Sequence, residues 1–131
     1  MSSVRTVLVL SLGVFFLMNL PLLAHHNAAT VYNVSEDAEV SMTGTVTKME
    51  WANPHIHFYI DVTDASGNVV NYAVEGGTPN SLYRRGWRKD VLPVGSVVTI
   101  QGAAPSRNGS PRVHLGSVTT AEGRELFSGR N

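Results

Sequence analysis

The sequence contains no cysteine, and its 131 residues include ten basic and ten acidic side chains. The lack of cysteine excludes a disulfide scaffold and any thiol chemistry. The balanced charge argues against a strongly cationic nucleic-acid-binding protein, and the 43% hydrophobic content argues against a highly charged disordered chain. A chain of this size fits one small domain that its hydrophobic core alone holds together.

Common enzyme motifs are absent as well. The sequence has no G-x-S-x-G nucleophile motif, no phosphate-binding P-loop and no H-E-x-x-H zinc motif. Glu50 and Asp61 could be considered a catalytic carboxylate pair, but solvated strand positions account for them more simply. We therefore expect a binding or accessory protein and not an enzyme.

The N-terminus has the layout of a secretory signal. Arg5 precedes an apolar run from Val7 to Met18, and the small residue Ala24 follows this run. We expect residues 1–24 to be a signal peptide, which gives a periplasmic or secreted protein with no stable membrane span after cleavage. Cleavage after Ala28, or an uncleaved anchor, is the alternative.

The clearest periodicity in the chain predicts a β-hairpin. Residues 25–38 show no sustained pattern and are expected to form an extended N-terminal arm before a single β-domain at 39–131. Residues 55–62 and 69–75 each alternate apolar and polar side chains, and a turn cluster at 64–68 separates them. The alternation predicts the following core-facing set: Ile56, Phe58, Ile60, Val62, Val70, Tyr72 and Val74.

A short helix is predicted after this hairpin. Thr78 can cap the helix, Pro79 suits its first position, and Gly86 suits the left-handed residue beyond its end. About two turns around Leu82 and Tyr83 then lie between strands.

Further strands complete a small barrel. Residues 39–51 predict a strand before the hairpin, with a bulge or bend at Gly44. Strands at 96–102 and 113–118 follow the helix, and residues 125–127 form a last short segment. Three strands, a helix and two more strands is the order of the oligonucleotide/oligosaccharide-binding barrel. We therefore predict an all-β, five-stranded, partly open barrel with one short helix.

Several motifs together resemble a known family. They are Gly44-Thr45-Val46, the Trp51 to His55 string, the Val74 to Asn80 string and Arg85-Gly86-Trp87, after an N-terminal segment that ends in Ala24-His25-His26. The chain resembles a family of small exported bacterial proteins of unknown function. The resemblance covers nearly the whole mature chain and implies a periplasmic single domain with no established reaction. The residues that match the family's typical positions are His25, His26, Trp51, Asn53, Pro54 and His55.

The histidines are the candidate metal ligands. Without cysteine they are the only strong ligands for Cu, Zn or Ni apart from four Met. His55 and His57 lie on one face of a strand, about 7 Å apart along the backbone, and Glu75 is expected opposite or diagonal to them as a ligand or an orienting carboxylate.

Processing at Ala24 would give His25 a free amine beside its own imidazole, a nitrogen set that Cu(II) favours. A cut after Leu23 would instead leave His26 as the third residue, which also suits Cu(II) or Ni(II). We therefore predict a copper site built from His25, His26, His55 and His57. The alternative is that these are hydrogen-bonded strand histidines and a histidine-rich cleavage junction.

A second candidate surface surrounds the tryptophans. The cationic residues Arg84, Arg85, Arg88 and Lys89 surround Trp87, which on such a barrel suggests phosphate contacts and base stacking. Export argues against nucleic acid, and cations at the end of a short helix also favour its dipole. A small anionic ligand or an acidic protein partner of the cell envelope is the alternative ligand. The predicted binding residues are Trp51, Asn53, Glu75, Arg84, Arg85 and Trp87.

Together these features predict a periplasmic binding or accessory protein that uses its histidine-bearing face and its N-terminus for a transition metal, with copper as the first choice. The alternative is a metal-free interaction module of the cell envelope. Haem binding through an exposed histidine is a third possibility.

Overall fold

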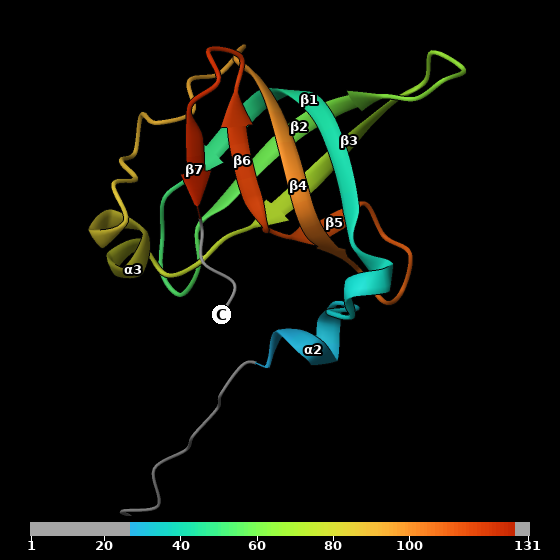
Figure 1. Ribbon diagram of the computed structural model, residues 1–131, viewed down its shortest axis with the longest axis horizontal. Helices are drawn as coiled ribbons and strands as arrows, with labels where there is room; N and C mark the ends of the chain where they lie inside the picture. The colour runs from blue at the N-terminus through green and yellow to red at the C-terminus, as the bar shows by residue number, and fades with distance from the viewer. Residues whose placement is uncertain (1–26, 128–131) are drawn as a thin grey trace, which may run out of the picture.

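Five β-strands of the chain close into a barrel, and a short helix packs against one end of it (Figure 1). The structure is a computed structural model that describes residues 27–127. Its strands are β1 (Val40–Glu50), β2 (His57–Thr63), β3 (Val69–Glu75), β4 (Val97–Pro105), β5 (Arg112–His114), β6 (Ser117–Thr120) and β7 (Glu125–Phe127).

Around the ring, β1 pairs with β2, β2 with β3, β3 with β5, and β5 with β4, and the pairing of β1 with β4 closes it. The pairing of β3 with β5 is parallel, whereas the other pairings of the ring are antiparallel. β6 and β7 continue the sheet from β4 outside the ring. The prediction of a small all-β barrel with one short helix after the third strand is confirmed, and the ring is closed.

β1 closes the ring because its 11 residues pair with two strands in succession. Its residues up to Thr45 pair with β4, and those from Thr45 onward pair with β2. Gly44 lies at this crossover, where a Cβ atom would stand 2.6 Å from the carbonyl oxygen of Asp61. The register irregularities fall on either side of it, at Val40/Met42 and at Val46/Lys48. Gly44 therefore permits a close approach of two backbones and does not itself form the bulge.

Gly116 divides the segment 113–118, for which the sequence predicted one continuous strand. β5 ends at His114, and β6 begins at Ser117. A Cβ atom on Gly116 would overlap the carbonyl oxygen of Gln101 in β4, so the chain can cross β4 here only without a side chain. The break lets β5 pair with β3 while β6 pairs with β4.

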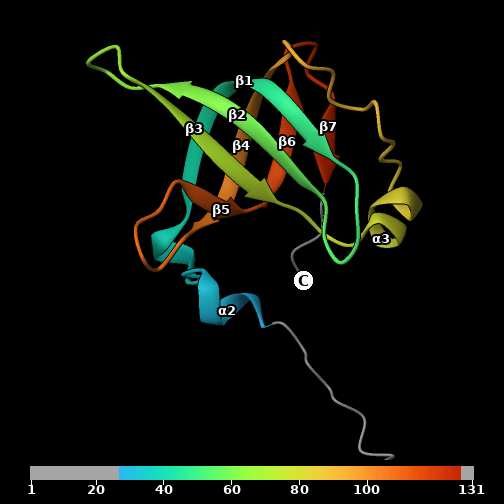
Figure 2. The same cartoon turned by 180° about the vertical axis from the view of Figure 1, so that it is seen from behind.

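The alternation predicted for the hairpin of β2 and β3 agrees with the strand register and with the burial. Val62, Val70 and Tyr72 lie on the core-facing side but near the hairpin tip, which extends beyond the barrel (Figures 1 and 2). For this reason Val62 and Tyr72 are only partly buried, and Val70 is 37% exposed. The remaining members of the predicted set have no exposed surface: Ile56, Phe58, Ile60 and Val74.

The helix α3 (Pro79–Arg84) begins and ends where the sequence predicted. Thr78 caps its first turn with its side chain, and Pro79 is its first residue. Beyond its end, Gly86 has a φ of +91°, and the Trp87 amide donates to the Leu82 carbonyl at 3.0 Å. This closing pattern is a Schellman motif, and it brings Trp87 into the core together with Leu82.

The N-terminal arm has more structure than the extended segment that we expected. Asn27 caps the helix α2 (Ala28–Val31) by accepting a hydrogen bond from the Ala29 amide, and a 3-10 helix, η1 (Glu36–Ala38), follows. Between them, Tyr32 forms an isolated bridge with Ser106. Within residues 27–127 no helix has the length and apolar character needed to cross a membrane. The predicted signal peptide lies outside the described residues.

Replacing a core aromatic residue tests the described packing. Phe58→Ala should lower the free energy of unfolding by about 3–5 kcal/mol, because a fully buried ring leaves a cavity. Val69→Ala is the control: Val69 lies in the same hairpin but is 60% exposed, so its loss should stay within about 0.5 kcal/mol. Urea unfolding measures both, and equal losses would contradict the described core.

Candidate functional site

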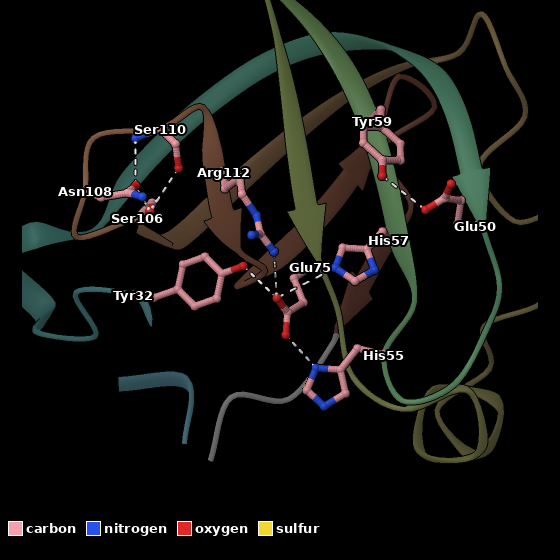
Figure 3. Close-up of polar contacts among 10 residues, drawn as sticks. All are labelled: Tyr32, Glu50, His55, His57, Tyr59, Glu75, Ser106, Asn108, Ser110 and Arg112. Atoms are coloured by element: carbon pink, nitrogen blue, oxygen red, sulfur yellow. Dashed lines mark hydrogen bonds and ion pairs between the residues drawn. The ribbon is translucent and has the colours of Figure 1, made fainter. Parts of the chain in front are cut away.

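A buried carboxylate, that of Glu75, lies at the centre of the polar side chains on the outside of the barrel (Figure 3). Glu75 is the last residue of β3, and only 6% of it is exposed. Across the sheet it pairs with His57 of β2 and with His114 of β5. These three residues form a row over neighbouring strands, on the side opposite the core-facing residues.

Two short hydrogen bonds hold the Glu75 carboxylate. Nδ1 of His55 lies 2.6 Å from Oε1, and the Tyr32 hydroxyl donates to Oε2 at 2.6 Å. The Arg112 guanidinium and Nε2 of His57 stand farther from Oε2, at 3.5 and 3.7 Å. Figure 3 shows the four side chains converging on Glu75 from separate segments. Both carboxylate oxygens are therefore paired, which is the condition for keeping a charge away from water.

Burial and the neighbouring groups act on the ionisation of Glu75 in opposite directions. Burial raises the pKa of Glu75, but the hydrogen bonds with Tyr32 and His55 outweigh it, so that the pKa lies below its ordinary value. Burial, reinforced by the bond to Glu75, raises the pKa of the Tyr32 hydroxyl far above its ordinary value. Near neutral pH, Tyr32 is thus a phenol that donates and Glu75 is a carboxylate that accepts.

The contact with Glu75 determines which nitrogen of His55 can bind a ligand. Because the carboxylate is ionised, Nδ1 carries the proton and donates it, so the lone pair of the neutral ring is on Nε2. Figure 3 shows Nε2 directed away from Glu75. A carboxylate placed behind an imidazole in this way is the arrangement that orients metal-binding histidines.

An open cavity of about 230 Å³ adjoins this group. One wall comes from α2 through Val31, and another comes from the loop before β2, where the peptide bond between Asn53 and Pro54 is cis. The N-terminal arm, this loop and three strands of the barrel therefore contribute to a single cavity. Its lining residues are Val31, Pro54, His55, His57, Glu75 and Arg112.

His114, the last member of the row, is held differently from the other histidines. Its ring lies edge-on to the Tyr32 ring, with the centroids 5.6 Å apart. Within residues 27–127 its buried Nδ1 has no well-formed hydrogen bond, although the Leu115 backbone acts to raise the pKa of the ring. Burial lowers the pKa of His114, although the charge of Glu75 acts to raise it. His114 therefore packs as a neutral ring against Tyr32.

The described residues do not form a complete metal centre. Between residues 27 and 127, no group of three or more histidine, cysteine or acidic side chains is arranged to hold a metal ion. His55 and His57 both direct a ring nitrogen toward Glu75, which is therefore their shared partner. The other predicted ligands, His25 and His26, lie outside the described residues.

Trp87, the centre of the predicted tryptophan surface, is not exposed in the structure. Trp87 has no exposed surface, and its ring packs 6.4 Å from that of Phe58 in the core. Trp51 is partly buried against the same core. Trp87 therefore cannot offer a stacking face to a ligand, because the Schellman turn after α3 places it inside the barrel.

The predicted polar binding residues divide between two regions. Arg84 and Arg85 are exposed at the end of α3, and Asn53 is exposed in the loop before β2. Arg88, beside them, turns back over the Tyr83 ring, with its guanidinium carbon 3.9 Å from the ring centroid. None of these residues lines the cavity at Glu75.

Sequence reasoning missed Tyr32 and Arg112 and left His114 unassigned. Tyr32 lies in an arm without periodicity, so nothing in the sequence indicated its long-range bond to Glu75. Arg112 and His114 flank the buried Val113, and this alternation does indicate a strand with both of them on the outer face. The parallel pairing of β5 with β3, which brings them to Glu75, has no local signature.

Fold and site together define the class of protein, a closed β-barrel with a carboxylate-anchored histidine on its outer face. Residues 15–114 match the model of a family described as "Family of unknown function (DUF6152)". The chain therefore belongs to this family, in agreement with the expected resemblance to a family without an established reaction. Neither a search of curated proteins nor a search of solved structures finds a match.

Removing one hydroxyl group tests the pairing of the buried carboxylate. Tyr32→Phe should lower the free energy of unfolding by about 1.5–3 kcal/mol, since the lost bond is to a charged acceptor. Tyr83→Phe is the control, because Tyr83 is 58% exposed and should change stability little. Denaturant titration compares the two variants, and a Tyr32→Phe protein as stable as its control would show that the bond is not formed.

The neutral His114 predicts a loss of stability as the pH falls. Its pKa is lowered in the folded chain, so the unfolded chain takes up the proton first as the pH drops through about 6.5. The lowered pKa of Glu75 acts in the same direction, but only at more acidic pH. The Tm should therefore decrease from about pH 7.5 to about pH 5.5.

His114→Gln should flatten this part of the Tm profile. Thermal unfolding of this variant and of the unaltered chain across this pH range measures the difference. A His114→Gln profile that falls as steeply as that of the unaltered chain would assign the loss to other groups.

Proposed function

We propose that this chain is an exported binding or accessory protein of the cell envelope that holds a transition metal, with copper as the first choice, through its histidines. The observation that carries the proposal is the 2.6 Å contact between Nδ1 of His55 and Oε1 of Glu75. An imidazole anchored through one nitrogen on a carboxylate presents the other nitrogen in a fixed direction, and such support strengthens metal binding. The proposed role is binding or delivery, without a reaction.

The N-terminal histidines would complete the ligand set. His26 immediately precedes Asn27, the cap of α2, and Val31 at the other end of this helix lines the cavity beside His55. Five residues of chain place the Cα of His26 no more than about 18 Å from that of Val31, and a helical path shortens this distance. Cleavage after Ala24 would also supply the amine of His25. The proposed ligands are His25, His26, His55 and His57.

The chemistry of these donors favours copper over zinc. All are nitrogen donors, and for such sites the affinity order of divalent metals peaks at Cu(II). The sequence has no cysteine, so the thiolates of closed structural zinc sites are not available.

Calorimetry and electron paramagnetic resonance with Cu(II), on the protein that begins at His25, test the proposal. We expect a Kd below about 10 µM, which corresponds to about 7 kcal/mol. His55→Ala and a blocked N-terminal amine should each weaken binding, and their effects should be non-additive because they belong to one site. The nitrogen hyperfine pattern should change in both cases, which a loss of stability alone would not produce.

Two further variants distinguish the orientation of His55 by Glu75 from a general effect of altering this row of side chains. Glu75→Gln should weaken copper binding by about tenfold or more, because the amide orients the His55 ring less strongly. His114→Gln is the matched control: it removes a histidine from the same row whose Nδ1 is buried, and it should leave copper affinity unchanged.

Two results would contradict the proposal. A folded, correctly processed protein whose Kd for copper exceeds about 10 µM would favour a metal-free interaction module, which the exposed Arg84 and Arg85 would serve. A short peptide beginning His25-His26 that binds copper as tightly as the whole protein would remove His55 and Glu75 from the site.

A further inference from the structure

The barrel has two ends, and α3 covers only one of them. At the covered end, Leu82 of α3 enters the core beside Ile56, near the end of β3. The opposite end is formed by the start of β1, the end of β2 and the loop between β4 and β5. Figure 2 shows α3 and the tip of the hairpin of β2 and β3 on opposite sides of the barrel. A cavity of about 370 Å³ opens at this second end, which we call the barrel mouth.

The surface of the barrel mouth is mainly apolar, with one charged group. Tyr72 lines it together with further apolar side chains that are only partly buried, namely Val40, Met42 and Val62. Hydroxyl groups of Ser41 and of the β4–β5 loop add polar positions, and Arg112 is the charged residue of the lining. No acidic residue of the described chain belongs to this lining, and Arg112, whose partner Glu75 lies outside it, is its one formally charged group.

Arg112 can take an anionic partner at the barrel mouth. Its side chain is 46% exposed, and the ion pair described for it, with Glu75, spans 3.5 Å. A guanidinium has five N–H donors, so the contacts of Arg112 with Glu75 and Tyr32 leave donors for a ligand carboxylate. The apolar side chains would in turn gain free energy when a hydrocarbon chain covers them.

We propose that the barrel mouth binds an apolar carboxylate of the size of a medium-chain fatty acid. Its hydrocarbon chain packs against Met42, Val62 and Tyr72, and its carboxylate pairs with Arg112. Mouths of β-barrels are common positions for such ligands, and the cavity volume lies in the range of small-molecule sites. Arg112 also pairs with Glu75, but none of the proposed copper ligands lines this cavity, so octanoate binding does not require copper.

Octanoate and octanol, which share the same chain but differ in charge, are the probes. Calorimetric titration of the purified chain should give a Kd for octanoate at least tenfold lower than for octanol. Arg112→Gln should bring the ratio of the two Kd values close to one, and Arg112→Lys should restore part of it. Equal binding of octanoate and octanol to the unaltered chain, or no binding of octanoate, would overturn the proposal.

Blocking the cavity tests its position. Val62→Trp fills the barrel mouth and should abolish octanoate binding, whereas Val69→Trp, on an exposed residue of the same hairpin that does not line the cavity, should preserve it. Ser41→Glu, at an exposed position of the lining, should weaken the binding of octanoate severalfold and leave the binding of octanol unchanged. This second variant keeps the test valid if Val62→Trp fails to fold. Octanoate binding that survives both Val62→Trp and Ser41→Glu would place the ligand elsewhere and contradict the assignment.

Discussion

The buried carboxylate of Glu75 is the constraint on which the outer face of this barrel depends. A charge with so little access to water persists only when each of its oxygens is paired. Tyr32 of the N-terminal arm and His55 of the loop before β2 provide the short contacts, and Arg112 of β5 adds a cation. One charged group thereby ties together segments that lie far apart in the sequence.

This constraint also explains the order of the N-terminal arm. The arm buries little apolar surface except at Tyr32, which is fully buried, and its ring packs edge-on against His114. Backbone contacts extend the attachment: the Asn33 amide donates to Pro105, and the Arg107 amide donates to Val31. The arm is therefore fixed beside the histidine cavity, and this position connects the proposed export processing at Ala24 with the proposed metal site.

The sequence predicted those features that follow from local physical rules. Alternation in the hairpin placed Phe58 in the core and Glu75 on the histidine face, opposite or diagonal to His55 and His57. The register, which alternation does not determine, puts it opposite His57. The helix limits followed from the capping residues Thr78 and Gly86. What could not be predicted depends on long-range packing, which has no local signature: the bond of Tyr32 to Glu75 and the parallel pairing of β5 with β3.

The central claim is that an ionised Glu75 fixes His55 with its proton on Nδ1 and its lone pair on Nε2. Nitrogen-15 NMR of the His55 side chain, in the metal-free protein at a pH where the ring carries one proton, tests this most directly because protonated and unprotonated ring nitrogens have distinct chemical shifts. The account predicts a protonated Nδ1 and an unprotonated Nε2 in the unaltered chain, and a mixture of tautomers in Glu75→Gln. A protonated Nε2 with an unprotonated Nδ1 in the unaltered chain would contradict it.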